Sequence, residues 1–311
     1  MPNKEGFERT ALQAAEANGD QSGKVFLITG AYGGLGMETT KALLKVKGQV
    51  ILAGRNEETM KSFVSQLEAE EYDMALVDAV GPPCDLADLE QVKAFAAYVK
   101  EKYTKLDCVI LNAGVMMCPA GVTKQNLEQQ VGVNVVGHFL LALSLLSITS
   151  RQVWVSSKSY EAGGKRFDFD WFQNFKADDP EYDANFAYQQ SKLGNILLAK
   201  EFAKRDNGNE AVKLETVALH PGMADTNLGR HVPSYVKGAT TLMGWVGILS
   251  KKTAEQGAAT TVTCATAALV QNGAYYEDCE PVNKLVGNVN VEEDGIRLFD
   301  LCVELTKDFQ Q

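Results

Sequence analysis

The stretch Lys24–Gly36 reads KVFLITGAYGGLG, and it decides the fold. Residues 24–29 form a continuous apolar run, which is typical of a strand buried on both faces. The glycine-rich turn that follows leads into a helix predicted for Leu35–Lys47. Such a turn lets the backbone approach a phosphate closely, and the N-terminus of the next helix supplies N–H groups and a positive dipole end. The stretch therefore predicts a dinucleotide pyrophosphate site, although a glycine-rich turn without a ligand is the alternative. The predicted binding residues are Gly30, Tyr32, Gly34, Leu35 and Gly36.

Strand-like and helix-like segments alternate along the rest of the chain without a linker-like change of composition. This pattern predicts an α/β fold, namely a single Rossmann-type doubly wound domain with a seven-stranded parallel sheet flanked by helices. We assign residues 1–22 to an N-terminal extension and residues 23–311 to the domain. The predicted strands are 24–29, 49–53, 75–84, 107–111, 151–155, 213–219 and 274–276. Prolines in the third of these indicate an edge strand or a distorted one.

Composition excludes several classes of protein. The net charge is −10 and the isoelectric point is about 5.0, which argues against a nucleic-acid surface. The 6 cysteines and 3 histidines show no metal-ligand spacing, so we expect no metal site. The cysteines are interpreted as buried, reduced thiols of an intracellular protein.

No apolar run approaches the roughly 20 residues that would span a bilayer, and the N-terminus lacks a signal-peptide pattern. We expect a cytoplasmic or soluble organellar protein, the plastid included if a transit peptide has been removed. Residues 226–252 are rich in apolar side chains and are interpreted as a substrate flap. The same segment is compatible with peripheral contact with a membrane or with a core helix. A homo-oligomer is compatible with the sequence.

Polar residues follow the second and third predicted strands. Arg55 comes after strand 49–53, where a basic residue accommodates the 2′-phosphate of NADP and an acidic one binds the ribose of NAD. We therefore expect NADP(H) to be preferred over NAD(H), unless Arg55 is a solvated surface residue. Asp85 and Leu86 are placed beside the adenine; alternatively, Asp85 or Asp88 caps the next helix.

Two further features follow the fourth predicted strand. The small residues Asn112, Ala113 and Gly114 stand where the strand ends, which in an open α/β sheet faces the ligand crevice. Asn134 lies among apolar neighbours in a helix predicted for Thr123–Thr149, where asparagine is unfavourable. A kink, a water-binding site and a catalytic role all explain it.

A tyrosine and a lysine four residues apart, Tyr188 and Lys192, begin another predicted helix and share one of its faces. A nearby ammonium favours the phenolate, which would give a proton donor and acceptor near neutral pH. Tyr98 and Lys102 have the same spacing in an ordinary amphipathic segment. Only the first pair follows a strand that ends in a serine, Ser157, and lies downstream of the glycine turn.

An aromatic-rich insert at 161–187 separates Ser157 from Tyr188. It is either the lining of an apolar substrate pocket, a lid, or a local core beneath a long loop.

These motifs occur together in the order found in short-chain dehydrogenases/reductases, which the chain resembles over about residues 23–305. They are Thr29-Gly30-x3-Gly34-x-Gly36, Asp85-Leu86, Asn112-Ala113-Gly114, Asn134, Ser157, Tyr188-x3-Lys192 and Pro221-Gly222-x3-Thr226. Within that superfamily the chain looks most like the retinol dehydrogenase branch, which is also similar to the WW-domain oxidoreductase and to light-dependent protochlorophyllide reductase. The residues that carry this likeness include Gly114-Val115-Met116-Met117-Cys118-Pro119, Gly137-His138-Phe139 and Leu219-His220-Pro221-Gly222.

The resemblance implies roles for four residues. Tyr188 would be the general acid or base, and Lys192 would lower its pKa and hold the nicotinamide ribose. Ser157 would bind the substrate oxygen, and Asn134 would anchor a water. Further cofactor contacts are implied for Pro221, Gly222, Met223 and Thr226.

The resemblance thus implies an NADP(H)-dependent oxidoreductase acting on an apolar carbonyl or alcohol, such as a retinoid, carotenoid or other isoprenoid, a steroid, or a long-chain aldehyde or ketone. A tetrapyrrole double-bond reductase and an NADP(H)-sensing binding protein are the alternatives. The sequence departs from the branch at Tyr32 and Met37 and in the longer insert before Tyr188, which leaves the substrate open.

Overall fold

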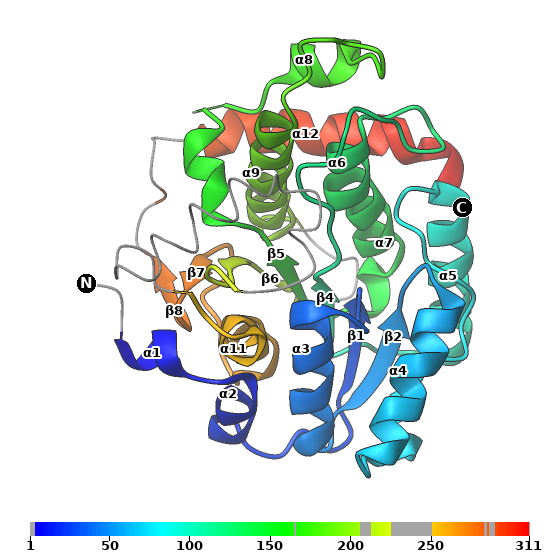
Figure 1. Cartoon of the computed structure of the whole chain (residues 1–311), viewed down its shortest axis with the longest axis vertical. Coiled ribbons are helices and arrows are strands. Elements are labelled where there is room, and N and C mark those ends of the chain that lie inside the picture. Colours follow the sequence, from blue (N-terminus) through cyan, green and yellow to red (C-terminus); the bar gives the residue numbers. More distant parts are fainter. Residues whose placement is uncertain are drawn as a thin grey trace.

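The structure, a computed structural model, describes residues 4–164, 166–205, 213–224, 251–282, 285 and 290–310 of the 311-residue chain. One sheet lies between two layers of helices (Figure 1). Its strands are β1 (Val25–Thr29), β2 (Gln49–Ala53), β3 (Val77–Asp78), β4 (Cys108–Leu111), β5 (Arg151–Val155), β6 (Glu215–His220), β7 (Tyr275–Glu277) and β8 (Glu280–Val282). The α-helices are α1 (Lys4–Glu8), α2 (Ala11–Ala17), α3 (Gly34–Lys45), α4 (Glu57–Ala69), α5 (Leu89–Lys102), α6 (Gln129–Val131), α7 (His138–Ser144), α8 (Phe169–Asn174), α9 (Ala184–Phe202), α11 (Ala254–Thr266) and α12 (Val291–Thr306).

The strand order places the functional crevice. The sheet runs β3-β2-β1-β4-β5-β6-β7-β8, and every neighbouring pair from β3 to β7 is parallel. The order reverses between β1 and β4, because successive connections cross the sheet in opposite directions on either side of this point. Ligands of open α/β sheets bind outside the carboxyl ends of the strands at such a reversal. The doubly wound α/β prediction is confirmed.

The predicted strand count of seven is wrong, because the sheet has an eighth strand. β8 pairs antiparallel with β7 through a two-residue turn at Asp278 and Cys279. Both turn residues have positive φ angles, 47° and 67°, which is the geometry of a type I′ turn. The usual signal for this turn is Asn-Gly or Asp-Gly, and this chain has no glycine there. Pro281 is tolerated because β8 is an edge strand.

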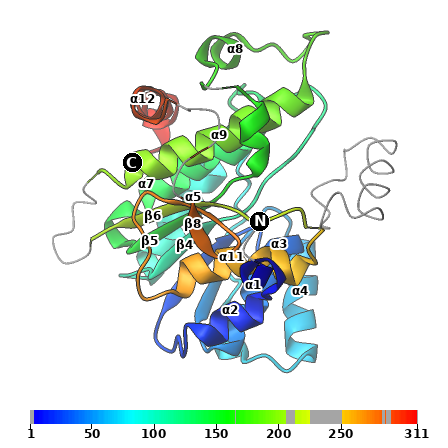
Figure 2. The same ribbon diagram turned by 90° about the vertical axis from the view of Figure 1, so that its left-hand side faces the viewer.

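The two faces of the sheet pack against different helices. Leu27 and Val109 belong to a core that includes residues of α5, α7, α9 and α12, whereas Phe26 and Ile28 belong to one that includes residues of α3 and α4. Side chains of a strand alternate between faces, so one apolar run fills both cores. Figure 2 shows the two helix layers on opposite sides of the sheet, with α8 projecting beyond the layer that holds α9.

The N-terminal helices are part of this packing. Ala14 and Ala15 of α2 are fully buried, in a cluster with Ala42 of α3 and Ala258 of α11. The small side chains let three helices approach one another closely. Within the described part of the chain, no helix is long and apolar enough to cross a membrane.

The helix predicted for Thr123–Thr149 is shorter and irregular. Asn126 adopts a positive φ of 59° in a tight loop, and Glu128 caps the first helical turn by accepting from the backbone of Gln130 and Val131. A π-helical segment, Gly132–Gly137, then separates α6 from α7. π-helical turns commonly mark functional sites, and this one contains Asn134.

Candidate active site

The glycine turn and the end of β4 are interlocked. A Cβ atom at Gly36 would lie 2.1 Å from the Gly30 carbonyl oxygen and 2.7 Å from Asn112 Nδ2, so only glycine fits there. Asn112 Nδ2 donates to the Thr29 carbonyl oxygen at 2.8 Å. Gly33, the residue before α3, offers no side-chain cap. The first N–H groups of that helix therefore remain available to an anion.

A cavity of about 240 Å³ opens over this turn. Ten of the predicted cofactor residues line it: Gly30, Tyr32, Gly34, Leu35, Arg55, Asp85, Leu86, Asn112, Ala113 and Gly114. The structure thus brings together residues from the ends of β1, β2 and β4 and from the loop that follows β3. Gly36 lies behind the turn, where its lack of a side chain permits the close approach of the backbone.

The β2 end of the cavity is shaped by Tyr32. Its ring lies on Gly54, and its hydroxyl oxygen accepts from the backbone N–H groups of Arg55 and Asn56, both at 3.2 Å. The Arg55 side chain is exposed, and no described carboxylate forms an ion pair with it. An unpaired guanidinium at this point suits a phosphate.

Asp85 and Asp88 have different roles. Asp88 is the N-cap of α5, with its side chain accepting from Glu90 N at 3.1 Å. Asp85 instead lines the cavity, and its Oδ1 atom accepts from Ala87 N at 3.0 Å.

Helix α9 carries the tyrosine and the lysine. Asp183 caps it by accepting from Asn185 N and Phe186 N, so the helix begins at Ala184, four residues before the predicted start. Tyr188 and Lys192 are 6% and 3% exposed. The Lys192 ammonium donates to the Val155 carbonyl oxygen at 3.0 Å and lies 5.7 Å from the centre of the Tyr188 ring.

Burial shifts the pKa values of Tyr188 and Lys192 in the directions that favour their neutral forms. Burial raises the pKa of Tyr188 to about 12, and a hydrogen bond from Ser157 opposes this rise. Burial lowers the pKa of Lys192 to about 8. The expected lowering of the tyrosine pKa by Lys192 is absent here, because desolvation outweighs the other influences and the lysine is directed at Val155.

Asn134 is fully buried and its side-chain amide has three partners. It accepts from Val115 N at 2.9 Å, and it donates to Val115 O and to Ser191 Oγ, both at 2.9 Å. A Cβ atom at Gly114 would lie 3.2 Å from Asn134 Oδ1 and 3.6 Å from Lys192 Nζ. The Asn112–Gly114 turn therefore joins the cavity over the glycine turn to the Tyr188 and Lys192 pair. The distorted helix explains the asparagine locally, and its catalytic role stays a prediction.

The other tyrosine–lysine pair has a structural role. Tyr98 and Tyr103 donate to the nearly buried Asp78 carboxylate of β3, and Lys102 forms an ion pair with it at 2.8 Å. This cluster ties α5 to β3 at the edge of the sheet, away from Ser157.

The Pro221–Met223 turn follows β6, with a φ of 87° at Gly222 and a 42% exposed Met223. Thr226 lies outside the described residues, as does almost all of the predicted flap at 226–252.

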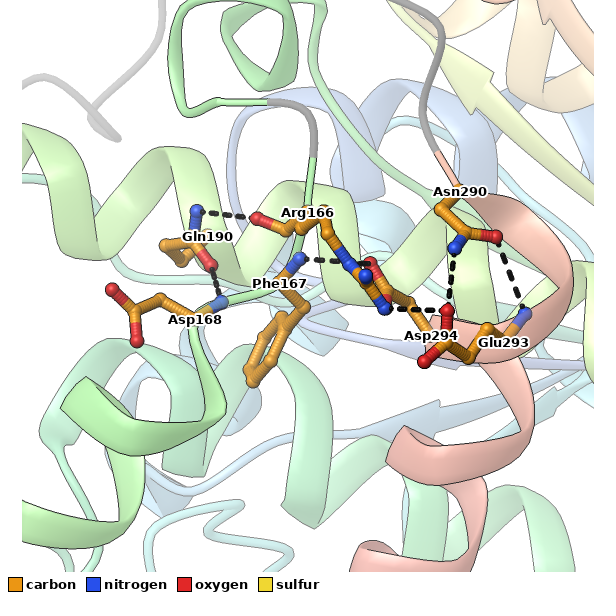
Figure 3. A network of polar contacts seen from close by, with 7 residues as sticks. All are labelled: Arg166, Phe167, Asp168, Gln190, Asn290, Glu293 and Asp294. Atoms are coloured by element: carbon orange, nitrogen blue, oxygen red, sulfur yellow. Dashed lines mark hydrogen bonds and ion pairs between the residues drawn. The ribbon is translucent and has the colours of Figure 1, made fainter.

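The insert forms a local core where it is described. Phe167, Phe169 and Phe172 are buried, with Phe167 making edge contacts to the other two rings. Figure 3 shows how its first part is held. Gln190 accepts from Asp168 N at 2.7 Å and donates to Gly163 O at 2.6 Å, while the fully buried Asp294 of α12 accepts from Arg166 Nη2 at 2.6 Å. This favours the local-core alternative for these rings.

Two residues of the site were not predicted. His138 is fully buried, and its ring nitrogens lie 2.9 Å from Thr29 Oγ1 and 3.0 Å from the Asn134 carbonyl oxygen. Gln130 is also fully buried, and it accepts from Met117 N at 2.8 Å and donates to Ala184 O at 2.7 Å. The spacing of Asn134 and His138, one helical turn apart, was the only available signal.

The remaining expectations concern cysteines and metals. All 6 cysteines are buried and none forms a disulfide. Among the described residues, no group of three or more His, Cys, Asp or Glu side chains is placed to hold a metal ion.

The sequence and the fold of this chain are similar to those of known proteins. Residues 24–158 match the family described as short chain dehydrogenase. Retinol dehydrogenase 14 of Homo sapiens is 37% identical over 317 residues, which cover 95% of this chain and 90% of that protein. A crystal structure of an uncharacterized protein from Mycobacterium paratuberculosis is 26% identical with a TM-score of 0.72, covering 94% of this chain and 97% of that one. A short chain dehydrogenase from Burkholderia cenocepacia in complex with NADP is 21% identical with a TM-score of 0.60, covering 87% and 99%.

Proposed function

Because this chain belongs to the short-chain dehydrogenase/reductase family, in its retinol dehydrogenase-like branch, we propose that it transfers hydride between NADP(H) and an apolar carbonyl or alcohol, with Tyr188 as the general acid/base. The observation that carries the proposal is the group formed by Ser157, Tyr188 and Lys192. This group lies at the carboxyl ends of the strands and adjoins the nucleotide cavity through Gly114.

The residues present fit a dinucleotide. The uncapped N-terminus of α3 suits the pyrophosphate, the cavity beside Asp85 and Leu86 suits the adenosine, and Arg55 suits a 2′-phosphate. When bound, the cofactor supplies or accepts the hydride at its nicotinamide ring. The protein therefore has to position the substrate and manage the proton.

Ser157 and Tyr188 would hold the substrate oxygen between their hydroxyl groups. In the reducing direction, negative charge develops on that oxygen, and two preorganised donors stabilise it. Tyr188 then transfers its phenolic proton to the oxygen, which completes the alcohol. In the oxidising direction the same oxygen returns its proton to Tyr188 as the carbonyl forms.

Lys192 would hold the nicotinamide ribose and favour the phenolate. With a pKa of about 8, Lys192 is mostly charged at neutral pH. Held beside the bound ribose, this charge would lower the Tyr188 pKa from its raised value. The substrate class is proposed from the retinol dehydrogenases among the relatives.

The test combines titration calorimetry with NADPH and NADH and a turnover screen at the nicotinamide absorbance band. Retinal and other apolar aldehydes and ketones are compared in wild type, Tyr188→Phe and Tyr98→Phe. We expect wild type to bind NADPH more tightly, Tyr188→Phe to bind it equally but lose turnover by about 100-fold or more, and Tyr98→Phe to turn over normally. Tyr98→Phe is the matched control, since it deletes the same hydroxyl from the other tyrosine–lysine pair.

If Tyr188→Phe turned over substrate as fast as wild type, Tyr188 would not be the general acid/base. Tight nucleotide binding with no turnover of any carbonyl would favour a sensing role, and turnover of a tetrapyrrole only under light would favour the pigment reductase alternative.

A further inference from the structure

One buried lysine outside the catalytic group joins three distant segments. The Lys252 side chain is fully buried, and its ammonium donates to Asp278 Oδ1 at 2.6 Å. The ammonium also lies 4.9 Å from the centre of the Phe7 ring. Lys252 thus connects the residues before α11, the turn between β7 and β8, and the N-terminal helix α1.

Lys252 also lies directly on the turn after β6. Its backbone N–H donates to Met223 O at 2.9 Å, and Ala224 and Lys252 form a parallel bridge. A Cβ atom at Gly222 would lie 2.6 Å from Lys252 Cδ, so the aliphatic part of the lysine packs on the bare Gly222 backbone. The positive φ of 87° at Gly222 keeps the turn in a shape that other residues rarely adopt.

The Pro221–Met223 turn follows β6, which neighbours β5 and lies on the opposite side of Ser157 from β2 and Arg55, so it faces the nicotinamide side of the proposed site. We propose that Lys252 is a positioning residue that holds this turn against the nicotinamide half of bound NADP(H), with Asp278 and Phe7 holding Lys252 in place. This inference rests on the proposed function, because it requires that a nicotinamide dinucleotide binds. It also gives the N-terminal segment a role, since α1 supports the Pro221–Met223 turn through the contact of Phe7 with Lys252.

The charge pair explains why the lysine stays in place. An ammonium with no solvent exposure needs a counter-charge, and Asp278, which is 18% exposed, supplies the only carboxylate with which Lys252 forms an ion pair among the described residues. The Asp278 turn is itself anchored, because Cys279 N donates to Thr260 Oγ1 of α11 at 3.2 Å. The α1 backbone is anchored separately through Gln256 Nε2, which donates to Glu8 O at 3.3 Å.

The test uses two ligands that share the adenosine half. NADPH contacts the whole site, whereas 2′,5′-ADP lacks the nicotinamide half, so a fault in the Pro221–Met223 turn weakens only NADPH. Asp278→Asn is the first variant, because asparagine tolerates the positive φ and retains the turn while the charge is lost. We expect titration calorimetry to show NADPH binding weakened about tenfold and 2′,5′-ADP binding unchanged within about twofold, since an unpaired ammonium moves toward solvent and withdraws its stem from Gly222.

Glu277→Gln is the matched control. It removes the neighbouring carboxylate of the same hairpin, which pairs with the half-exposed Lys158 at 3.1 Å rather than with Lys252. Both ligands should bind this variant as they bind wild type.

Two lysine variants separate packing from charge. Lys252→Met keeps an unbranched stem over Gly222 and should weaken NADPH by no more than about threefold, whereas Lys252→Ala removes the stem and should match Asp278→Asn. Thermal unfolding of each variant, followed with and without 2′,5′-ADP, reports that the adenosine half of the site is intact.

The inference is overturned if Asp278→Asn and Lys252→Ala bind NADPH as wild type does, or if NADPH and 2′,5′-ADP weaken equally. Failure of wild type to bind either ligand is a different result, because it contradicts the proposed function on which the inference rests.

Discussion

His138 Nε2 lies 2.9 Å from Thr29 Oγ1, so one buried imidazole connects the strand before the glycine turn with the π-helical segment. Thr29 Oγ1 already accepts from Asn112 N at 2.9 Å and Ala113 N at 3.0 Å. His138 Nδ1–H donates to the Asn134 carbonyl oxygen, so Nε2 of a neutral ring accepts the Thr29 proton, for which the Ile110 carbonyl oxygen at 3.4 Å is the more distant acceptor. The imidazole is neutral, and burial lowers its pKa to about 3. Thr29 and His138 thereby fix the nucleotide cavity relative to Asn134.

Replacing His138 by Phe should destabilise the protein. The Thr29 hydroxyl and the Asn134 carbonyl would lose buried partners, so we expect the free energy of unfolding to fall by about 1–3 kcal/mol in urea titrations. His138→Gln can replace one of the two hydrogen bonds and should lose less. Equal stability of His138→Phe and wild type would contradict the connection.

The same residue predicts a pH dependence. The His138 imidazole has a pKa of about 6.5 in the unfolded chain and of about 3 in the folded protein. Between these values the unfolded state binds one more proton, so lowering the pH favours unfolding. Wild type should therefore lose more stability than His138→Gln between pH 6.5 and pH 4. Parallel losses in the two proteins would show that His138 is not the group responsible.

The low pKa of Lys192 predicts how the stability of the protein changes above neutral pH. Its pKa falls from 10.5 to about 8 on folding, so at neutral pH its charged form opposes folding by about 3 kcal/mol. This penalty is present below pH 8 and disappears as pH rises toward 10.5. Lys192→Met should accordingly be more stable than wild type at pH 7, with the difference shrinking by pH 9.5. A difference that does not change with pH, measured by urea unfolding without nucleotide, would contradict the burial effect.

Arg55 predicts the choice of nucleotide. Its exposed guanidinium has no ion-pair partner among the described side chains, and a charged hydrogen bond to a 2′-phosphate contributes about 1.5–3 kcal/mol. Arg55→Ala should therefore weaken NADPH binding by about 10-fold to 100-fold and leave NADH almost unchanged. Lys61→Ala is the control, since Lys61 is an exposed cation on the neighbouring α4. If Arg55→Ala and Lys61→Ala weakened NADPH binding equally, Arg55 would act only through long-range electrostatic attraction and not through contact with the 2′-phosphate.

Replacing Arg166 and replacing Asp294, which form an ion pair, should reduce the stability of the protein by different amounts. Asp294 is fully buried, whereas the Arg166 side chain is 51% exposed and also reaches Glu293 at 2.8 Å. Arg166→Ala leaves a buried carboxylate without its cation and should be the more destabilising of the two changes. Asp294→Ala leaves a guanidinium that solvent and Glu293 can satisfy, so a smaller loss of about 1–2 kcal/mol is expected. Urea unfolding of both variants measures the difference, and the reverse order would contradict this reading of burial.

Local sequence patterns were sufficient for much of the nucleotide half. The apolar run at 24–29, the glycines after it and the small residues at 112–114 predicted a strand end, a turn and a second strand end that do meet around one cavity. Such predictions succeed because a buried parallel strand and a glycine turn are each determined by a few consecutive residues. The order of the motifs also predicted that Ser157 and Tyr188 act together, and in the structure these two side chains share a hydrogen bond whereas Tyr98 donates to Asp78.

Two other features could not be predicted from residue types and spacing. The turn at Asp278 and Cys279 has left-handed backbone angles that its residue types do not signal, so β8 was missed. The Tyr188 pKa depends on how deeply packing buries it, and desolvation reversed the direction expected from the neighbouring Lys192.

The sequence by itself thus determined the fold class and the places of the glycine turn and of the tyrosine–lysine pair in it, because each depends on residues close together in the chain. Only the tertiary structure decided what surrounds those residues. It placed His138 against Thr29, Gln190 against the insert, and Lys252 between Phe7, Asp278 and Gly222. The physical reason is that burial, hydrogen-bond partners and ion pairing depend on distances in space between segments that the chain separates by many residues.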